Sequence, residues 1–303
     1  MRQQLRALGP SIIAILAVLL LGACGNTSKL DAARALAQTA TIYEPEFSAI
    51  AADYYASCVR TYNWTFGVTP DQDKLKFQSP AEWCADAYAA AQQWQKTNAV
   101  LLSYLKGLGA LAGGQGNDYG IPALVNDIAA LNNTTKWFDL SPDAANGIAS
   151  FGAWVTQAYF AGKRASALGT VVPGADPYVQ NIVRALQGVA TNHYGAQYLW
   201  LELHAVDLFY DQYLLNPPSA PNTLSAREQW INDRQAVAAR YAGISAYVDA
   251  LDRIAKAHTA LVAVLTTKTF RNNEHLVHTL DQGIFIGDMR ILRAVYHVRG
   301  GAK

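Results

Sequence analysis

The sequence predicts an all-α protein, built as an elongated antiparallel bundle of long helices. Alanine, the strongest helix former, supplies 52 of the 303 residues. Apolar residues between the glycine and proline clusters recur every three or four positions and rarely alternate, which is the period of a helix and not of a strand. Apolar seams sustained over many turns indicate helices that pack side by side at shallow angles.

The first helix of the folded body is expected over residues 28–64, with a break before Pro45, because a residue that precedes proline disfavours the helical conformation. Three further helices are predicted from a capping residue that is followed by proline. They begin at Ser79, Ser141 and Asp176 and run to about residues 107, 169 and 215. The first of the three also carries Glu82, which completes a capping box.

Residues 216–223, with the sequence NPPSAPNT, predict a loop. Helices are expected after it over residues 225–270 and 273–298. The folded body therefore covers residues 30–303 as one helical bundle domain, and residues 172–176 mark the place where it would divide into two parts. Three helices carry long seams, over 83–108, 179–214 and 230–265. The second seam includes Ala196, Trp200, Leu203 and Tyr210, and the third includes Tyr241. Helices of about 40 residues would make a rod about 60 Å long.

Polar residues on these seams are the first candidates for a site, because a buried charge must be matched or neutralised. If the two helices around residue 219 fold back on each other, Asp207 lies level with Arg234. We therefore predict an ion pair between them that fixes the register of the helices, in preference to a catalytic carboxylate at Asp207. His193 and His258 also lie on seams and are interpreted as core histidines with polar partners.

Two other histidine patterns leave alternatives open. His204 lies one turn before Asp207, and His275 and His278 share one face of a predicted helix. The second pair could give two imidazoles to a metal, but two ligands do not make a metal site. No known catalytic motif occurs, so we assign no catalytic residue, no metal and no cofactor.

The N-terminus has the pattern of an export signal. Arg2 and Arg6 precede an uncharged apolar run at residues 11–21, which is too short to span a bilayer as a stable helix. The sequence Leu21-Gly22-Ala23-Cys24 that ends this run resembles the lipobox of bacterial lipoprotein precursors. The resemblance implies a signal peptide at residues 1–23, cleavage before Cys24, and acyl chains such as palmitate on Cys24. The alternative is an uncleaved or ordinarily cleaved signal with a chance cysteine.

The same resemblance implies a location. Residues 24–29 would be a short lipidated tether that holds the folded body at the membrane. Gly25 stands where an aspartate would imply retention in the inner membrane of enteric bacteria, so we expect the outer membrane, facing the periplasm, with the cell surface as the other choice. Export also predicts a disulfide between Cys58 and Cys84, because they form an even pair in an oxidising compartment.

Charge and composition narrow the function. The chain is 51% hydrophobic and only 16% charged, which excludes intrinsic disorder, and its formal net charge of +1 without a basic run argues against nucleic acid as a partner. We expect a lipid-anchored scaffold or accessory protein with an envelope protein as its partner. The alternative is an envelope enzyme, or a bundle that binds a small ligand or metal, using His204, Asp207 or the pair His275 and His278.

The most exposed aromatic cluster is expected at Tyr54, Tyr55, Tyr62, Trp64 and Phe66.

Overall fold

A computed structural model of the chain describes residues 9–66, 79–113, 164–215, 220–266 and 290–296. Almost every described residue is helical, and no strand occurs among them. The prediction of an all-α bundle is therefore confirmed. The helices expected from Ser141 and over residues 273–298 lie outside the described residues, except that residues 290–296 are helical.

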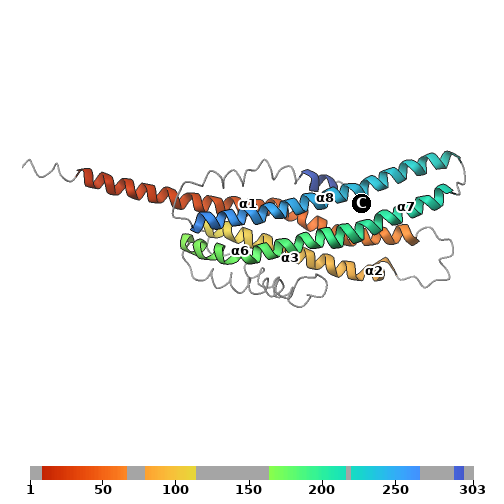
Figure 1. Cartoon of the computed structure of the whole chain (residues 1–303), viewed down its shortest axis with the longest axis horizontal. Coiled ribbons are helices and arrows are strands. Elements are labelled where there is room, and N and C mark those ends of the chain that lie inside the picture. Colours follow the sequence, from red (N-terminus) through yellow and green to blue (C-terminus); the bar gives the residue numbers. More distant parts are fainter. Residues whose placement is uncertain (1–8, 67–78, 114–163, 216–219, 267–289, 297–303) are drawn as a thin grey trace, which may run out of the picture.

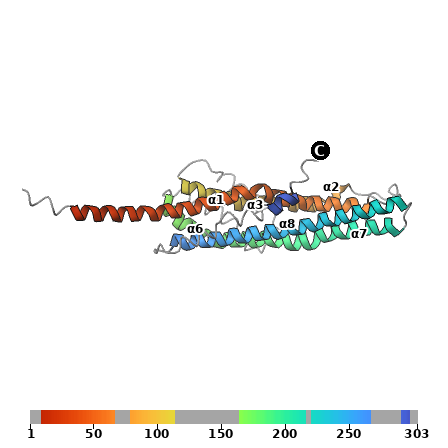
Figure 2. The same ribbon diagram turned by 90° about the horizontal axis from the view of Figure 1, so that it is seen from above.

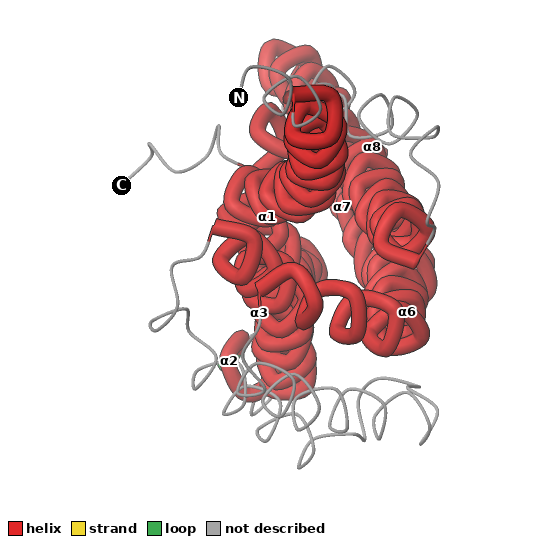
Figure 3. The backbone as a smooth tube through the Cα atoms, turned by 90° about the vertical axis from the view of Figure 1, so that its left-hand side faces the viewer, coloured by secondary structure: helices red, strands yellow, loops and turns green. Residues whose placement is uncertain are grey.

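The described residues form four long helical rods. The rods run alternately in opposite directions (Figure 1, Figure 2). Each lies beside its neighbours along much of its length, so the bundle is elongated, and the end-on view shows the rods around a common core (Figure 3). At about 1.5 Å per residue, the 47 residues of the last rod span about 70 Å. The rods are α1 (Gly9–Phe66), α3 (Ala85–Gly113), the continuous α6 (Arg164–Gly188), η2 (Val189–Leu199) and α7 (Trp200–Leu215), and α8 (Ala220–Thr266).

A chain of neutral hydrogen bonds ties three of the rods together in the core. Trp94 of α3 donates from Nε1 to the Tyr247 hydroxyl of α8 at 2.8 Å, and that hydroxyl donates to Asn98 Oδ1 at 2.6 Å. Asn98 Nδ2 in turn donates to the backbone carbonyl of Phe47 in α1 at 2.8 Å. All four residues are buried, and their polar groups satisfy one another inside an aromatic core.

The capping box at Ser79 is confirmed. Its side chain accepts a hydrogen bond from the Glu82 backbone, and the Glu82 carboxylate accepts one from the Ser79 backbone. The box opens α2 (Pro80–Trp83), and Cys84 separates this single turn from α3. Cys84 forms the predicted disulfide with Cys58, with their Cα atoms 5.9 Å apart.

Three of the predicted boundaries that differ from the structure involve proline. α1 continues through Pro45, because Tyr43 and Phe47 on either side are completely buried and their packing outweighs the lost backbone bond. α6 begins at Arg164 and passes through residues 172–176, so Asp176 does not cap a helix. α8 begins at Ala220, within the predicted loop; Pro221 then stands in the first turn, where its missing N–H removes no helical bond.

In the seam predicted over residues 179–214, Tyr210 is buried, but the unbroken burial of successive seam residues ends at Val189. From there η2 is a π-helix, whose wider turns move the buried positions to Ala190, Tyr194 and Leu199. The predicted seam residues Ala196 and Trp200 are exposed instead, Trp200 by 55%. The widened turns thus rotate the start of α7 relative to a continuous α-helix.

Candidate functional site

Four charged side chains meet inside the bundle: Asp53 and Arg60 of α1, Glu202 of α7, and Arg240 of α8. We call them the charge cluster. Glu202 and Arg240 are the most deeply buried, with side chains 1% and 7% exposed. Two carboxylates face two guanidinium groups, so the formal charges balance.

Arg60 holds both acids at once. Its Nε atom lies 2.6 Å from Glu202 Oε1 and its Nη1 atom 2.8 Å from Asp53 Oδ1. Arg240 closes the network from α8, with Nη1 at 2.9 Å from Glu202 Oε1 and Nε at 3.3 Å from Asp53 Oδ2. Each carboxylate therefore contacts both arginines, whereas a carboxylate in an ordinary surface ion pair has one partner.

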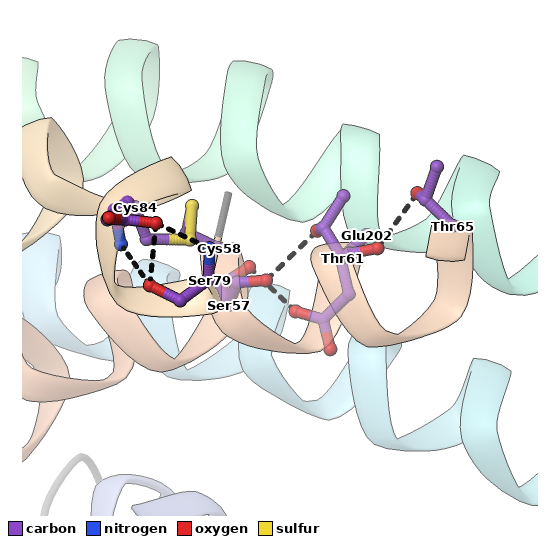
Figure 4. Close-up of a disulfide and its surroundings, with 8 residues drawn as sticks. Ser57, Cys58, Thr61, Thr65, Ser79, Cys84 and Glu202 are labelled. Carbon is purple, nitrogen blue, oxygen red and sulfur yellow. Dashed lines mark hydrogen bonds between the residues drawn. A yellow bond between two sulfur atoms is a disulfide. The ribbon is translucent and has the colours of Figure 1, made fainter. Parts of the chain in front are cut away.

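Two hydroxyl groups complete the network. Ser57 donates to Glu202 Oε2 at 2.7 Å, and Tyr194 of the π-helix donates to Asp53 Oδ2. Figure 4 shows Ser57 directed at Glu202, one residue from the Cys58–Cys84 disulfide. The disulfide thus fixes the turn of α1 that presents Ser57.

The electrostatics favour the ionised forms of Asp53 and Arg60. Burial raises the pKa of Asp53, but Arg60 and Arg240 oppose it strongly enough that the pKa is lower than that of an ordinary aspartate. Burial lowers the pKa of Arg60, and Asp53 and Glu202 more than reverse that effect, so its pKa is raised. Burial, followed by the negative charge of Asp53, raises the pKa of Tyr194 well above that of a free tyrosine. At neutral pH Tyr194 therefore serves as a neutral donor to a carboxylate.

The π-helix puts this cluster together at the expense of apolar burial. Immediately after it, the charged Glu202 is buried, while Trp200 and Leu201 on the same turn are 55% and 43% exposed. Hydrophobic burial alone favours the opposite arrangement. Because π-helical turns are rare and concentrate at functional sites, the inversion marks the charge cluster as a candidate site.

A cleft of about 180 Å³ opens beside the cluster between α1, α7 and α8. Its polar and aromatic walls come from residues of all three helices, and the small apolar side chains of Val206 and Ala236 complete it. The polar and aromatic lining residues are Arg60, Asn63, Trp64, Glu202, Asp233 and Arg240. A larger groove of about 450 Å³ lies between α1 and α3, but its charged lining residues, Glu44 and Lys96, are not buried.

A second buried polar cluster surrounds His258, which is completely buried. Its Nε2 atom lies 2.7 Å from the Tyr104 hydroxyl, and its Nδ1 atom lies 2.8 Å from Asp176 Oδ1. The hydrogen bond from His258 is the main cause that lowers the pKa of Asp176. The prediction that His258 is a core histidine with polar partners is confirmed. His193 is half-buried.

Asp207 and Arg234 lie together as the fold-back of α7 and α8 predicts, with Arg234 Nε 3.6 Å from Asp207 Oδ1. Trp230 supports the pair: its Nε1 donates to Asp207 Oδ1 at 2.9 Å, and the Arg234 guanidinium lies 5.2 Å from its ring centroid. Both charged side chains are partly exposed, at 31% and 46%. The geometry is that of a register contact at the surface.

The remaining predicted residues are dispersed. His204 is exposed and stacks on Trp200, and neither His204 nor Asp207 lines the cleft beside the charge cluster. His275 and His278 lie outside the described residues. Within the described part of the chain, no three histidine, cysteine or acidic side chains gather closely enough to hold a metal. The prediction of an exposed aromatic cluster around the disulfide is wrong. Tyr54 is buried against Trp94, Tyr194 and Tyr198, and the other four residues are half-buried: Tyr55, Tyr62, Trp64 and Phe66.

The N-terminal predictions stay predictions. The backbone of α1 is helical through Cys24 and through residues 24–29. No helix is long and apolar enough to cross a membrane in the part of the chain whose side chains the structure describes, which begins at residue 29.

The comparisons with known proteins give no relative: no family model, no curated protein and no solved structure matches the chain.

Sequence reasoning missed the charge cluster. Glu202 lies one position before Leu203 and Arg240 one position before Tyr241, and only those neighbours belong to the predicted seams. One signal was available: Asp53, Ser57 and Arg60 recur at helical spacing next to Cys58 in an otherwise apolar and aromatic stretch. Polar side chains at such spacing within a buried helix need hydrogen-bond or ion-pair partners on the helices that face them.

Proposed function

We propose that the protein is a lipid-anchored component of the bacterial cell envelope that acts as a non-catalytic scaffold or accessory protein through protein contacts. The anchor is the acylated Cys24 that the lipobox resemblance implies. The folded body is a rod, and α1 runs from the anchor cysteine along it without a break. Cys24 and Phe66 are 42 positions apart in the sequence, which corresponds to about 63 Å of helix.

The observation that carries the proposal is the outer face of α7. Trp200, His204 and Leu208 follow one another at steps of four residues and are all exposed, Trp200 by 55% and Leu208 by 49%. Leu201 widens this face, and the His204 ring stacks on Trp200 at 5.4 Å, which holds the indole in place. Tryptophan and leucine presented together on a fixed helix suit an apolar helix face of a partner protein.

The position of this face favours a protein over the membrane. Glu202, beside Trp200, contacts Ser57 of α1, which is 33 residues, or about 50 Å of helix, from Cys24. A rod that stands on its anchor holds the α7 face beyond the reach of its own leaflet. The partner is therefore expected to be an envelope protein that extends away from the membrane.

A photocrosslinking amino acid at Leu208, introduced into the lipidated protein in its native envelope, tests the proposal. We expect one discrete protein adduct, which is lost with Trp200→Ala and redistributed with Cys24→Ala. The same crosslinker at the exposed Ser245 of α8 is the matched control and should not give that adduct. Identical adducts at both positions, or a lipid adduct at Leu208, would contradict the proposal.

A further inference from the structure

The cleft beside the charge cluster carries a hydrogen-bond donor that the protein does not use. Arg240 is almost fully buried, and its Nη1 and Nε atoms face Glu202 and Asp53. Its Nη2 atom donates no hydrogen bond to any residue of the described chain. Arg240 lines the cleft, and an acceptor that enters the cleft beside the guanidinium group can use this donor capacity.

An acceptor of the opposite charge lies further along the same wall. Asp233 Oδ2 accepts a hydrogen bond from the Tyr210 hydroxyl at 2.9 Å, and its Oδ1 atom accepts none within the described residues. Asp233 and Arg240 are seven residues apart on α8 and therefore lie on the same face, about 10 Å apart along the helix axis. The cleft thus has an unused donor at its Arg240 end and an acidic group at its Asp233 end.

The charges indicate what kind of ligand fits. Asp53 and Glu202 already neutralise Arg60 and Arg240, so the arginine end has an unused hydrogen-bond donor without a net charge, whereas Asp233 adds an uncompensated negative charge at the other end. A simple anion could accept from Arg240 but would leave Asp233 unmatched, and a simple cation could pair with Asp233 but would leave the Arg240 donor without an acceptor. A small molecule with both charges matches both ends.

Size and surface agree with that ligand. The volume of about 180 Å³ is about the space of six water molecules in the liquid. Trp64, Val206 and Ala236 offer apolar surface between the two ends. A short aliphatic chain fits there.

We propose that this cleft binds a small aminocarboxylic acid, with its carboxylate on Arg240 and its ammonium group on Asp233. The site is independent of the partner face on α7, so it adds a ligand-binding function to the proposed scaffold. It also explains why the chain buries Glu202: the π-helix and Glu202 hold Arg240 in place at the end of the cleft, because Arg240 Nη1 binds Glu202.

Calorimetric titration of the exported chain tests this with a series of named probes. Glycine, 4-aminobutyrate and 6-aminohexanoate vary the distance between the charges, while hexanoate and hexylamine each lack one charge. We expect 6-aminohexanoate to bind about tenfold or more tightly than either singly charged probe. A tenfold ratio of affinities corresponds to the contribution of one charge-assisted hydrogen bond. No binding of the series at millimolar concentrations, or equal binding of hexanoate, would overturn the proposal.

Asp233→Asn locates the effect. The asparagine keeps an acceptor for Tyr210 but loses the negative charge. The affinity for 6-aminohexanoate should therefore fall to that for hexanoate, and the affinity for hexanoate should not change. Asp249→Asn, at an exposed position of the same helix, is the matched control and should leave both affinities unchanged. A folded Asp233→Asn protein that binds 6-aminohexanoate normally would overturn the assignment. If that variant fails to fold by circular dichroism, the probe series on the wild-type protein decides the question alone.

Discussion

Two polar networks lie inside the same bundle and differ in how the helices hold them. The neutral chain of Trp94, Tyr247 and Asn98 connects regular α-helices, and every described bond in it ends on another buried group. The charge cluster reaches its geometry only because η2 is a π-helix, and it borders a cleft. The neutral network therefore serves packing, whereas the charge cluster holds buried charge next to solvent, as binding sites do.

The largest expected effect comes from removing one charge of the cluster. Glu202→Gln leaves Arg60 and Arg240 buried with one carboxylate between them, which should lower the free energy of unfolding by about 3–5 kcal/mol. Urea denaturation measures the change. The control is Glu228→Gln on the exposed face of α8, whose free energy of unfolding should lie within about 0.5 kcal/mol of the wild-type value. A loss below about 1 kcal/mol at Glu202 would mean that the cluster is not buried as described.

The disulfide should have the next largest effect. It closes a loop with 25 residues between Cys58 and Cys84, so replacing both by alanine should lower the free energy of unfolding by about 3 kcal/mol. Chemical reduction of the wild-type protein should give a similar loss. An unchanged urea midpoint after either treatment would contradict the role of the disulfide in holding α2 and α3 against α1.

The neutral network should be less sensitive than the charged one. Tyr247→Phe removes the hydroxyl that joins Trp94 to Asn98 and leaves two buried groups without that partner, for a loss of about 1–3 kcal/mol. The exposed Tyr88→Phe serves as the control in the same unfolding experiment. If Tyr247→Phe destabilised the protein more than Glu202→Gln, the comparison of the two networks would be reversed.

The smallest expected effect is a dependence on pH. The folded-state pKa of Asp53 is lowered, so its ionised form stabilises the fold fully above the ordinary aspartate value of about 3.9, and the stabilisation is lost as the pH falls through the lowered pKa. The difference in unfolding free energy between wild type and Asp53→Asn should therefore be constant from about pH 7 to 5 and narrow below about pH 4. A difference that already narrows at pH 6 would contradict a lowered pKa.

Much of the fold could be predicted from sequence because its determinants are local. The capping box at Ser79 and the seam through Trp94 and Leu101 depend on residues within a few turns of one another. The contact between Asp207 and Arg234 requires only that two regular helices fold back about residue 219. The disulfide could be predicted from the even pair of cysteines together with the expectation of export.

The charge cluster could not be predicted because the register changes between Val189 and Leu199. An α-helical period places Trp200 in the core and Glu202 outside it, and the π-helix reverses both. Pro45 and Pro177 lie inside helices for a related reason: local preference favours a helix boundary at each proline, and packing over long distances keeps the helix intact.

The central claim is the π-helical register of η2, and thiol labelling at Ala196 tests it most directly. In the chain with Cys24→Ala and the disulfide intact, Ala196→Cys should react with a maleimide as fast as Ala238→Cys, because both positions are exposed. Ala190→Cys, at a completely buried position, should be protected. If Ala196→Cys were as protected as Ala190→Cys, residues 189–199 would follow the α-helical seam, and the burial of Glu202 in the charge cluster would be wrong.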